Sequence, residues 1–593
     1  MRSFIASSLA AVLTAAVLAA PASAWTARPA TYGVAKQQDV SITMSDGVVL
    51  HADVLRPAAP DGTPAPGKFP VLLTQTPYNK LAPSLNFETD YLVTRGYVQV
   101  IADVRGTGSS EGAWDSFGSR EQRDGYELAG WAQSQPWSDG RLGLHGTSYG
   151  AINQLLTAAQ HPKGLRAEFT IVPSADTYRD ISDSGGQLDT SFIPSWLGLV
   201  TGLGLLPPTY TGSDPVEAAR VISQHIGGAA AFQAPTVLGA TTGGDLAYDG
   251  PFYRQRSPIE VIDKVNVPTF VMGGWFDLFQ RGEPLLYQRL RRNHVPTRLV
   301  MGPWYHLTAG NGLPADGLGD ENELELRWMD HYVRSVKDPA LNTDIAPVTY
   351  FENGEGHYHR VADYPAPDGH AIAVHLAGTA APGSNGQLTT APASGGPDTI
   401  AWNPATGVCS RSTAQWTAGA AAPPCETDNR ANDLYGLSYD LPVTKPLHLF
   451  GPIDAHLFVT SANGRDGQLT ARVEDVAPDG TATQLTAGWQ VLSLRANTTA
   501  RSVYRDGLMV QPYHPYTRDS VLPIDAGPMA VDVEIFPTGS LIAAGHTLRL
   551  TLQPADAPHL TAPLPQMAAS AGGVLGIVHD AAHQSELVLS VRG

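Results

Sequence analysis

Hydrophobic positions in the first part of the chain fall into short runs separated by amphipathic stretches. Residues 69–74, 97–102 and 142–145 are mostly apolar, which is typical of strands buried on both faces. Residues 119–132, between the last two runs, carry an apolar stripe at helical spacing. Strands that alternate with helices indicate a largely parallel sheet. We therefore predict an α/β fold for this part of the chain.

The same pattern continues on either side of these runs. Residues 40–55 alternate in two β-like stretches joined by Asp46-Gly47, which predicts an antiparallel hairpin at the sheet edge. Residues 151–159 carry apolar side chains three and four positions apart, as an amphipathic helix does. Further strands are predicted at residues 267–272 and 298–301, and a closing helix at about residues 323–336.

The pattern changes twice along the chain. Between residues 178 and 257 the strand signal fades and Gly-rich stretches mix with helical pieces, so we expect an inserted, mainly helical lid. Beyond Gly369, period-two strands with Gly, Pro and Asp turns favour a β-sandwich. The expected divisions are a core in residues 25–177 and 258–368, a lid in residues 178–257, and a C-terminal β domain in residues 369–593.

The first residues have the form of a secretory signal peptide. Arg2 precedes an apolar run over residues 9–20, and Ala22-Ser23-Ala24 forms an A-x-A cleavage site. The apolar run is too short for a membrane span. We therefore expect residues 1–24 to be removed and the mature protein to be extracellular or periplasmic, with no membrane partner. In such an oxidising compartment the two cysteines, Cys409 and Cys425, are expected to form a disulfide rather than remain free thiols.

Composition adds two constraints. A chain of 593 residues, 42% of them hydrophobic, is too long for one hydrophobic core, so two or three domains are expected. The formal net charge is -18, and the basic residues gather in no stripe that could follow phosphates. This excludes nucleic acid as an expected partner. The sequence indicates no oligomeric state.

Residues 146–150 (GTSYG) carry the clearest chemical signal. A G-x-S-x-G sequence between a strand and a helix is a nucleophile elbow, in which the glycines allow a sharp turn that exposes the serine hydroxyl. The predicted strand at 142–145 and helix at 151–159 provide that setting. Because a serine hydroxyl is a weak nucleophile, Ser148 needs a base, an acid that orients the base, and donors for the oxyanion.

Asp277 and His306 meet the remaining requirements. In this arrangement the acid and the base follow the serine in that order, each just after a core strand. Asp277 comes after the predicted strand at 267–272, and His306 comes after that at 298–301. We expect activity to fall at low pH, because a protonated His306 cannot act as a base.

Through several motifs the chain resembles a known family, the cocaine esterase and Xaa-Pro dipeptidyl-peptidase group, or CocE/NonD-type α/β-hydrolases. Besides the elbow, they are residues 76–80 (TPYNK), 103–112 (DVRGTGSSEG), 248–253 (YDGPFY), 274–277 (GWFD) and 302–306 (GPWYH). The resemblance implies an α/β-hydrolase core, a helical lid and a C-terminal jelly-roll domain. It also implies a catalytic Ser148, Asp277 and His306, with an oxyanion hole formed by the Tyr78 hydroxyl and the Tyr149 backbone N–H.

Residues around the expected site bear on the substrate. Amino-acid ester hydrolases that the chain resembles carry acidic residues just after the catalytic Asp, where this chain has Leu278, Phe279 and Gln280. This argues against a substrate with an α-ammonium group, which needs a carboxylate partner. Aromatic residues are expected to form apolar pocket walls, with plain core packing as the alternative. They are Trp196, Trp275, Phe276, Phe279 and Trp304.

We therefore predict a serine hydrolase that cleaves carboxylic esters, or amides, through an acyl-enzyme, with a small-molecule substrate and neither metal nor organic cofactor. One alternative is a dipeptidyl-peptidase that releases Xaa-Pro dipeptides, for which an acid in or near the lid would bind the peptide amine. The candidates for that acid are Asp176, Asp180, Asp183, Asp189 and Asp249. The other alternative is a non-catalytic binding protein on a hydrolase scaffold.

Overall fold

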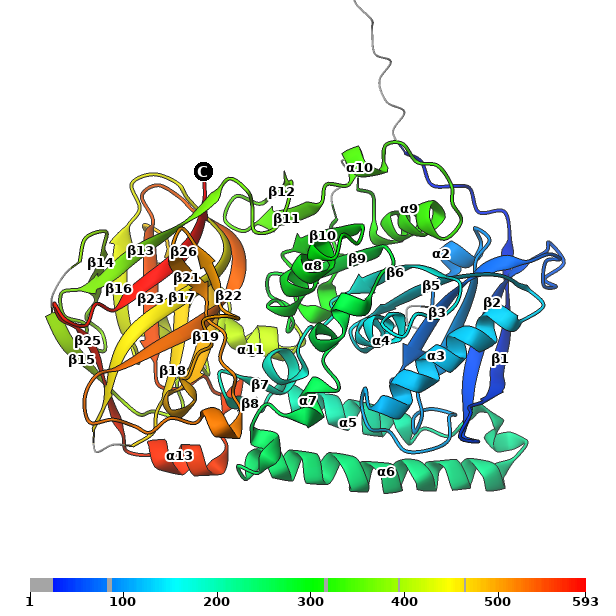
Figure 1. Ribbon diagram of the computed structural model, residues 1–593, viewed down its shortest axis with the longest axis horizontal. Helices are drawn as coiled ribbons and strands as arrows, with labels where there is room; N and C mark the ends of the chain where they lie inside the picture. The colour runs from blue at the N-terminus through cyan, green and yellow to red at the C-terminus, as the bar shows by residue number, and fades with distance from the viewer. Residues whose placement is uncertain (1–24, 83–87, 314–317, 393–394, 463–464) are drawn as a thin grey trace, which may run out of the picture.

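The computed structural model describes residues 25–82, 88–313, 318–392, 395–462 and 465–593, so the expected signal peptide lies outside the described residues (Figure 1). A ten-stranded sheet organises the first part of the chain. In spatial order its strands are β1 (Gly33–Thr43), β2 (Val49–Ala58), β4 (Val98–Asp103), β3 (Phe69–Thr76), β5 (Ser138–Thr147), β6 (Leu165–Ile171), β9 (Thr269–Gly274), β10 (Thr297–Gly302), β11 (Val348–Glu352) and β12 (His357–Val361).

The central strands of this sheet, from β4 through β11, are parallel to one another. β1 and β2 form the predicted antiparallel hairpin at one edge, and β11 and β12 form another at the opposite edge. The strands predicted from apolar runs coincide with β3, β4, β5, β9 and β10, and all eight residues of β3 are buried. The prediction of a largely parallel sheet is confirmed.

Helices cover both faces of the sheet. The apolar sides of α3 (Ser119–Ser134), α4 (Tyr149–Ala158) and α8 (Gly282–Arg292) pack in one hydrophobic cluster with the sheet. The helices α2 (Asp90–Val93) and α9 (Glu321–Tyr332) pack in a separate cluster with residues such as Phe169 and Phe270. These three layers match the alternation of strands and helices in the sequence.

The segment expected as a lid is mainly helical and contains α5 (Phe192–Gly204), α6 (Pro215–Thr241) and α7 (Pro251–Arg254). Asp214 caps α6 by accepting a hydrogen bond from the Glu217 N–H, and Pro215 occupies the first turn, where its missing N–H costs nothing. Figure 1 shows α6 running along the lower edge of the molecule, beneath α5 and α7. The sequence did not predict the short strands β7 (Asp183–Ser184) and β8 (Gln187–Asp189), which form a small sheet with β24 (Leu560–Thr561).

An eleven-stranded, largely antiparallel sheet builds the C-terminal part. Its buried apolar side chains form a second hydrophobic core. This part is the expected β domain, and Figure 1 shows it beside the core. In spatial order its strands are β15 (Gly395–Ala401), β25 (Val574–His579), β17 (Leu447–Ser461), β22 (Met529–Ile542), β19 (Ala482–Val491), β18 (Gln468–Val476), β23 (Thr547–Gln553), β16 (Leu437–Pro442), β14 (Gly386–Thr389), β13 (Gly369–Ala377) and β26 (Glu586–Arg592).

Smaller elements complete the structure. β20 (Val503–Arg505) and β21 (Leu508–Gln511) form a separate hairpin, and the other α-helices of the described residues are α10 (Leu341–Asp344), α11 (Arg411–Trp416), α12 (Arg430–Asp433) and α13 (Leu564–Ser570). A disulfide joins Cys409 and Cys425, as predicted, and closes a loop that contains α11. Among the described residues, no helix is both long and apolar enough to cross a membrane.

Glu168 on β6 makes stability depend on pH. Its side chain is fully buried; Oε1 accepts a hydrogen bond from Thr269 Oγ1 at 2.8 Å, and Oε2 has no partner among the described residues. Burial raises the pKa of Glu168 to about 8. Between the ordinary carboxyl pKa and pH 8 the folded state therefore holds a proton that the unfolded state has lost, so the free energy of unfolding falls as the pH rises.

Because glutamine is neutral at every pH and can accept the same hydrogen bond, Glu168→Gln should remove this dependence. We expect the variant to gain stability relative to the wild type by about 1.4 kcal/mol for each pH unit across this window. Chemical denaturation of both proteins at several pH values measures the difference in their free energies of unfolding. The other buried carboxyls contribute equally to both proteins and therefore cancel in this difference. Parallel stability curves would contradict the assignment.

Candidate active site

Ser148 lies at a sharp turn between β5 and α4. β5 ends at Thr147, α4 begins at Tyr149, and Ser148 has φ 54° and ψ -118°, a conformation that is strained for a residue with a side chain. A Cβ atom at Gly146 would lie 3.2 Å from the backbone of Gly150. The glycines of the motif therefore allow the tight turn, and the local geometry is that of the predicted nucleophile elbow.

Ser148, His306 and Asp277 form a hydrogen-bonded chain. Ser148 Oγ donates to His306 Nε2 at 2.7 Å, and His306 Nδ1 donates to Asp277 Oδ1 at 2.5 Å. The three residues follow β5, β10 and β9, which are parallel, so their carboxyl ends meet at one edge of the sheet. Asp277 is fully buried and His306 is 8% exposed. The structure thus brings together the three residues that the sequence predicted.

Asp277 is held from several sides. Its Oδ2 accepts a hydrogen bond from the Phe279 N–H at 2.6 Å, and its carbonyl accepts one from Gln415 Nε2 of α11 at 2.9 Å. Glu283 of α8, fully buried, lies beside it; burial and the neighbouring Asp277 carboxylate raise the pKa of Glu283 well above its ordinary value. Both effects favour the protonated form of the Glu283 carboxyl. Neither Gln415 nor Glu283 stood out in the sequence, because nothing local marks either residue.

Tyr78 and Tyr149 are both close to Ser148. The Tyr78 hydroxyl is within hydrogen-bonding reach of the Ser148 side chain and accepts a hydrogen bond from Trp196 Nε1 at 3.2 Å. Burial raises the pKa of Tyr78, so its hydroxyl keeps its proton and can donate. Tyr149 is the first residue of α4, where a backbone N–H has no acceptor within the helix. The Tyr149 side chain points elsewhere, since its hydroxyl donates to Glu121 Oε1 at 2.6 Å.

A cavity of about 520 Å³ opens in front of Ser148, and we call it the Ser148 cavity. All three parts of the chain line it, and most of the contributing side chains are apolar or small. They are Tyr78, Thr147, Ser148, Ile171, His306, Leu307, Ala309 and Glu321 of the core, Ser191, Phe192, Ser195, Trp196 and Leu199 of the lid, and Trp416, Thr417, Ala418, Ala420 and Ala421 of the disulfide-closed loop. The C-terminal domain therefore forms one wall of the cavity.

Of the five aromatic residues predicted to line the pocket, only Trp196 does so. The prediction is wrong for Trp275 and Trp304, which are buried in the core. Trp275 Nε1 donates to the Phe351 carbonyl, and Trp304 Nε1 to that of Asn311. These residues follow strands whose side chains alternate between the two faces of the sheet, so closeness in sequence to Asp277 or His306 did not place them in the cavity.

The prediction is also wrong for Phe276 and Phe279. Phe276 packs against Tyr305 and lies beneath the guanidinium of Arg411. Phe279 places its ring edge-on to His306, with 5.1 Å between ring centroids, so it supports the imidazole but does not line the cavity. Trp416, more than a hundred residues further along the chain, takes the wall position that was expected of these side chains.

The acidic side chain in the cavity is not one of those that the sequence predicted to bind an amine. None of the five aspartates proposed to bind an amine lines the Ser148 cavity, and Asp176, Asp180 and Asp249 form ion pairs with Arg179 or Arg281. Glu321, at the start of α9, is the one carboxylate among the described lining residues. Burial, with a contribution from nearby Glu325, raises the pKa of Glu321 to about 7. Apart from its position at a helix N-terminus, nothing in the sequence marks Glu321 as a cavity residue.

Two protein-family models match the chain. Residues 46–308 match the X-Pro dipeptidyl-peptidase (S15 family) model, and residues 342–587 match the model of the X-Pro dipeptidyl-peptidase C-terminal non-catalytic domain. The chain belongs to the cocaine esterase and X-Pro dipeptidyl-peptidase family. It is therefore a serine hydrolase with an α/β-hydrolase core and a C-terminal β domain, and the non-catalytic alternative is not supported.

Individual relatives agree with this assignment over most of their length. The cocaine esterase of Rhodococcus sp. (strain MB1 Bresler) is 28% identical, over 89% of this chain and 92% of its own. A Mycobacterium bovis protein described as a serine esterase is 27% identical, over 87% and 90%. The crystal structure of a CocE/NonD family hydrolase from Staphylococcus aureus superposes with a TM-score of 0.69 at 19% identity, covering 94% of this chain and 93% of that one. This likeness shows the shared fold.

Proposed function

We propose that the protein hydrolyses carboxylic esters through an acyl-enzyme formed on Ser148. In this mechanism His306 takes the proton of Ser148 as the hydroxyl attacks the substrate carbonyl, and then gives it to the leaving group. Asp277 orients His306 and stabilises the imidazolium that forms. The Tyr78 hydroxyl and the Tyr149 N–H donate to the oxyanion of the tetrahedral intermediate. Water then attacks the acyl-enzyme by the same route.

The hydrogen-bonded chain from Ser148 through His306 to Asp277 is the observation that carries this proposal. Both distances are within hydrogen-bonding range, and the chain ends at an open cavity of about 520 Å³. A general base must lie within about 2.6–3.2 Å of the atom that carries the proton it takes, and His306 Nε2 satisfies this condition towards Ser148 Oγ.

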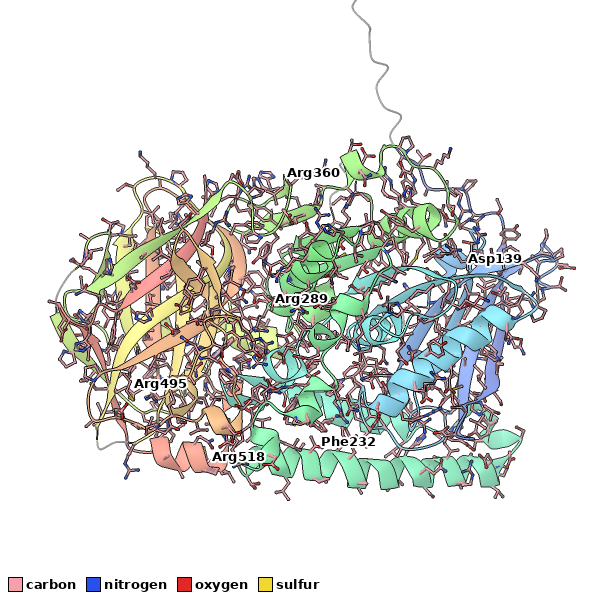
Figure 2. The ribbon with its side chains drawn as sticks, viewed as in Figure 1. Asp139, Phe232, Arg289, Arg360, Arg495 and Arg518 are labelled. Carbon is pink, nitrogen blue, oxygen red and sulfur yellow. A yellow bond between two sulfur atoms is a disulfide. The ribbon has the colours of Figure 1, made fainter. Side chains whose placement is uncertain are left out.

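The lining of the Ser148 cavity supports an apolar acyl group. Trp196, Trp416 and Leu199 provide large apolar surfaces. A second cavity of about 80 Å³ lies behind Trp196, between the lid helices and the core, and is lined mainly by apolar residues such as Phe117, Leu197 and Phe232 (Figure 2 labels Phe232 on α6). Because Trp196 belongs to both linings, we infer that its indole separates the two cavities.

Trp196→Ala is expected to join the two cavities and to shift the preference towards longer acyl chains. Each methylene that becomes buried contributes about 0.8 kcal/mol, so two or more raise the ratio of kcat/KM for an octanoyl ester over an acetyl ester roughly tenfold or more. Using the ratio cancels any general loss caused by removing the indole donor to Tyr78. Trp196→Phe loses the same donor but keeps an aromatic wall, and should retain the wild-type ratio. An unchanged ratio in Trp196→Ala would contradict the dividing role.

Glu321 favours a second candidate function, cleavage of peptides or amides that carry an amine, as in the dipeptidyl-peptidases of the family. A desolvated ammonium group needs a carboxylate partner, and Glu321 is available in the cavity. Because the pKa of Glu321 is raised to about 7, the charged carboxylate, and with it the binding of a cation, increases as the pH rises through 7.

A substrate panel distinguishes the two functions. p-Nitrophenyl esters of increasing chain length and Xaa-Pro-p-nitroanilides are assayed with the wild type and with Glu321→Gln. The proposal predicts turnover of the esters, with little change in Glu321→Gln. Turnover of the anilides alone, lost in Glu321→Gln, would establish the peptidase instead.

We also propose that the protein is secreted after cleavage behind Ala24. The A-x-A sequence at residues 22–24 supports this, as does the Cys409–Cys425 disulfide, since disulfides persist mainly in oxidising compartments. N-terminal sequencing of the exported protein should begin at Trp25. Recovery only inside the cell, with residues 1–24 retained, would refute this proposal.

A further inference from the structure

A cluster of histidine and glutamate side chains lies where the core meets the C-terminal domain, apart from the Ser148 cavity. Glu352 ends β11, Glu355 lies in the following turn and His359 is on β12, so all three belong to one edge hairpin. His448 reaches the cluster from β17 of the C-terminal domain. In Figure 2, Arg360, the neighbour of His359 on β12, is labelled at the top of the molecule between the two parts.

The donor atoms of this cluster converge. His359 Nε2 lies 2.5 Å from Glu355 Oε2 and 3.2 Å from Glu352 Oε2, and these three atoms are all within 4.8 Å of one another. The other Glu352 oxygen, Oε1, accepts a hydrogen bond from His448 Nδ1 at 3.0 Å. A zinc ion with bonds of about 2.0–2.1 Å holds tetrahedral ligand atoms roughly 3.3 Å apart, close to the spacing of His359 Nε2 and Glu352 Oε2.

Glu352 gives a second, independent indication of a ligand. Its side chain is only 1% exposed, and among the described residues Oε2 makes an ion pair with His359 Nε2 at 3.2 Å, which lacks the geometry of a hydrogen bond. A buried carboxylate oxygen without a hydrogen bond carries a desolvation cost that a bound cation would remove. Glu355 and His359 remain about one-third exposed, which leaves a path for an ion from solvent.

We propose that Glu352, Glu355 and His359 bind a zinc ion, with a water molecule as the fourth ligand. Two carboxylates offset the charge of the ion, and an imidazole ligand favours zinc over calcium or magnesium, which prefer oxygen ligands alone. His448 holds the second oxygen of Glu352 and so positions that ligand, as hydrogen-bonded outer partners do in zinc sites.

The site would link two domains. The β11–β12 hairpin already pairs with β22, since the Asn353 N–H donates to the Gly539 carbonyl at 2.9 Å. An ion on Glu352, held in turn by His448, adds a polar link between the core sheet and β17. Zinc binding should therefore stabilise the folded protein and leave the chemistry at Ser148 unchanged, because a ligand that binds only the folded state raises its stability.

Zinc titration of the full-length protein, after dialysis against EDTA, tests the proposal. Isothermal titration calorimetry should give one site per chain with a Kd in the micromolar range or below, and the melting temperature should rise with zinc. Co²⁺ should give the visible absorption of a four-coordinate ion. His359→Ala and Glu355→Gln should each weaken zinc binding at least tenfold and abolish the rise in melting temperature.

Two of the variants guard against an ambiguous result. Glu355 is exposed, so Glu355→Gln should fold even if a change at buried Glu352 does not. His546→Ala removes a histidine that pairs with the single carboxylate of Asp475 and should bind zinc as the wild type does. Absence of saturable zinc binding, or equal binding by the wild type, His359→Ala and Glu355→Gln, would overturn the proposal and leave the cluster an ion-pair network.

Discussion

Replacement of Ser148 by alanine is expected to lower kcat for ester hydrolysis by roughly 10⁵- to 10⁶-fold. The variant keeps the cavity and the oxyanion donors but cannot form the acyl-enzyme, so only the residual rate from binding and oxyanion stabilisation remains. The same change should abolish covalent labelling by a fluorophosphonate, because this reagent reacts with an activated serine hydroxyl. Mass spectrometry of the labelled wild type should locate the adduct on Ser148.

Ser195 provides the matched control for this experiment. It lines the same cavity, but its hydroxyl donates to the Ser191 carbonyl at 2.9 Å and not to a histidine. Ser195→Ala should therefore keep both labelling and kcat within a few-fold of the wild type. Persistent labelling of Ser148→Ala, or loss of labelling in Ser195→Ala alone, would show that Ser148 is not the nucleophile.

Tyr78→Phe is expected to reduce kcat by roughly 10²- to 10³-fold with little change in KM, equivalent to about 3–4 kcal/mol of transition-state stabilisation. The hydroxyl lies beside Ser148 and keeps its proton because burial raises the pKa of Tyr78. A neutral donor fixed before the reaction interacts most strongly with the oxyanion, which exists only in the transition state and the intermediate. This difference explains why kcat, rather than KM, should respond.

Tyr210→Phe serves as the control, because it likewise removes one phenolic hydroxyl, but from the lid. The Tyr210 hydroxyl donates to the Ser109 carbonyl and does not line the Ser148 cavity. Its loss should leave kcat nearly unchanged. If Tyr78→Phe behaved like Tyr210→Phe, or raised KM without lowering kcat, Tyr78 would bind the ground state and the oxyanion would depend on other donors.

The fold could be predicted well because its signals are local. The apolar runs that became β3, β4 and β5 are buried on both faces of a parallel sheet, and such burial demands continuous hydrophobic sequence. Close approach of the backbone favours the glycines around Ser148, since a Cβ at Gly150 would lie 3.3 Å from the Gln75 carbonyl. Where a requirement acts within a few residues, the sequence shows it.

The lining of the Ser148 cavity could not be predicted, because contacts between distant segments decide it. Trp275 and Trp304 lie close in sequence to Asp277 and His306 but point into the core, whereas Trp416 comes from the C-terminal domain. Glu321 enters the cavity only because α9 begins beside the loop that follows His306. No periodicity or motif along the chain encodes such proximity.

The sequence by itself determined the parallel sheet, the elbow at Ser148 and the order of Ser148, Asp277 and His306, because hydrophobic periodicity, glycine conformation and strand ends are properties of short segments. Only the tertiary structure decided which side chains surround the serine, that Gln415 and Trp416 of another domain complete the site, and that Glu352, Glu355 and His359 converge beside His448. These arrangements depend on how the domains pack, and packing is set by contacts between residues that are far apart in the chain.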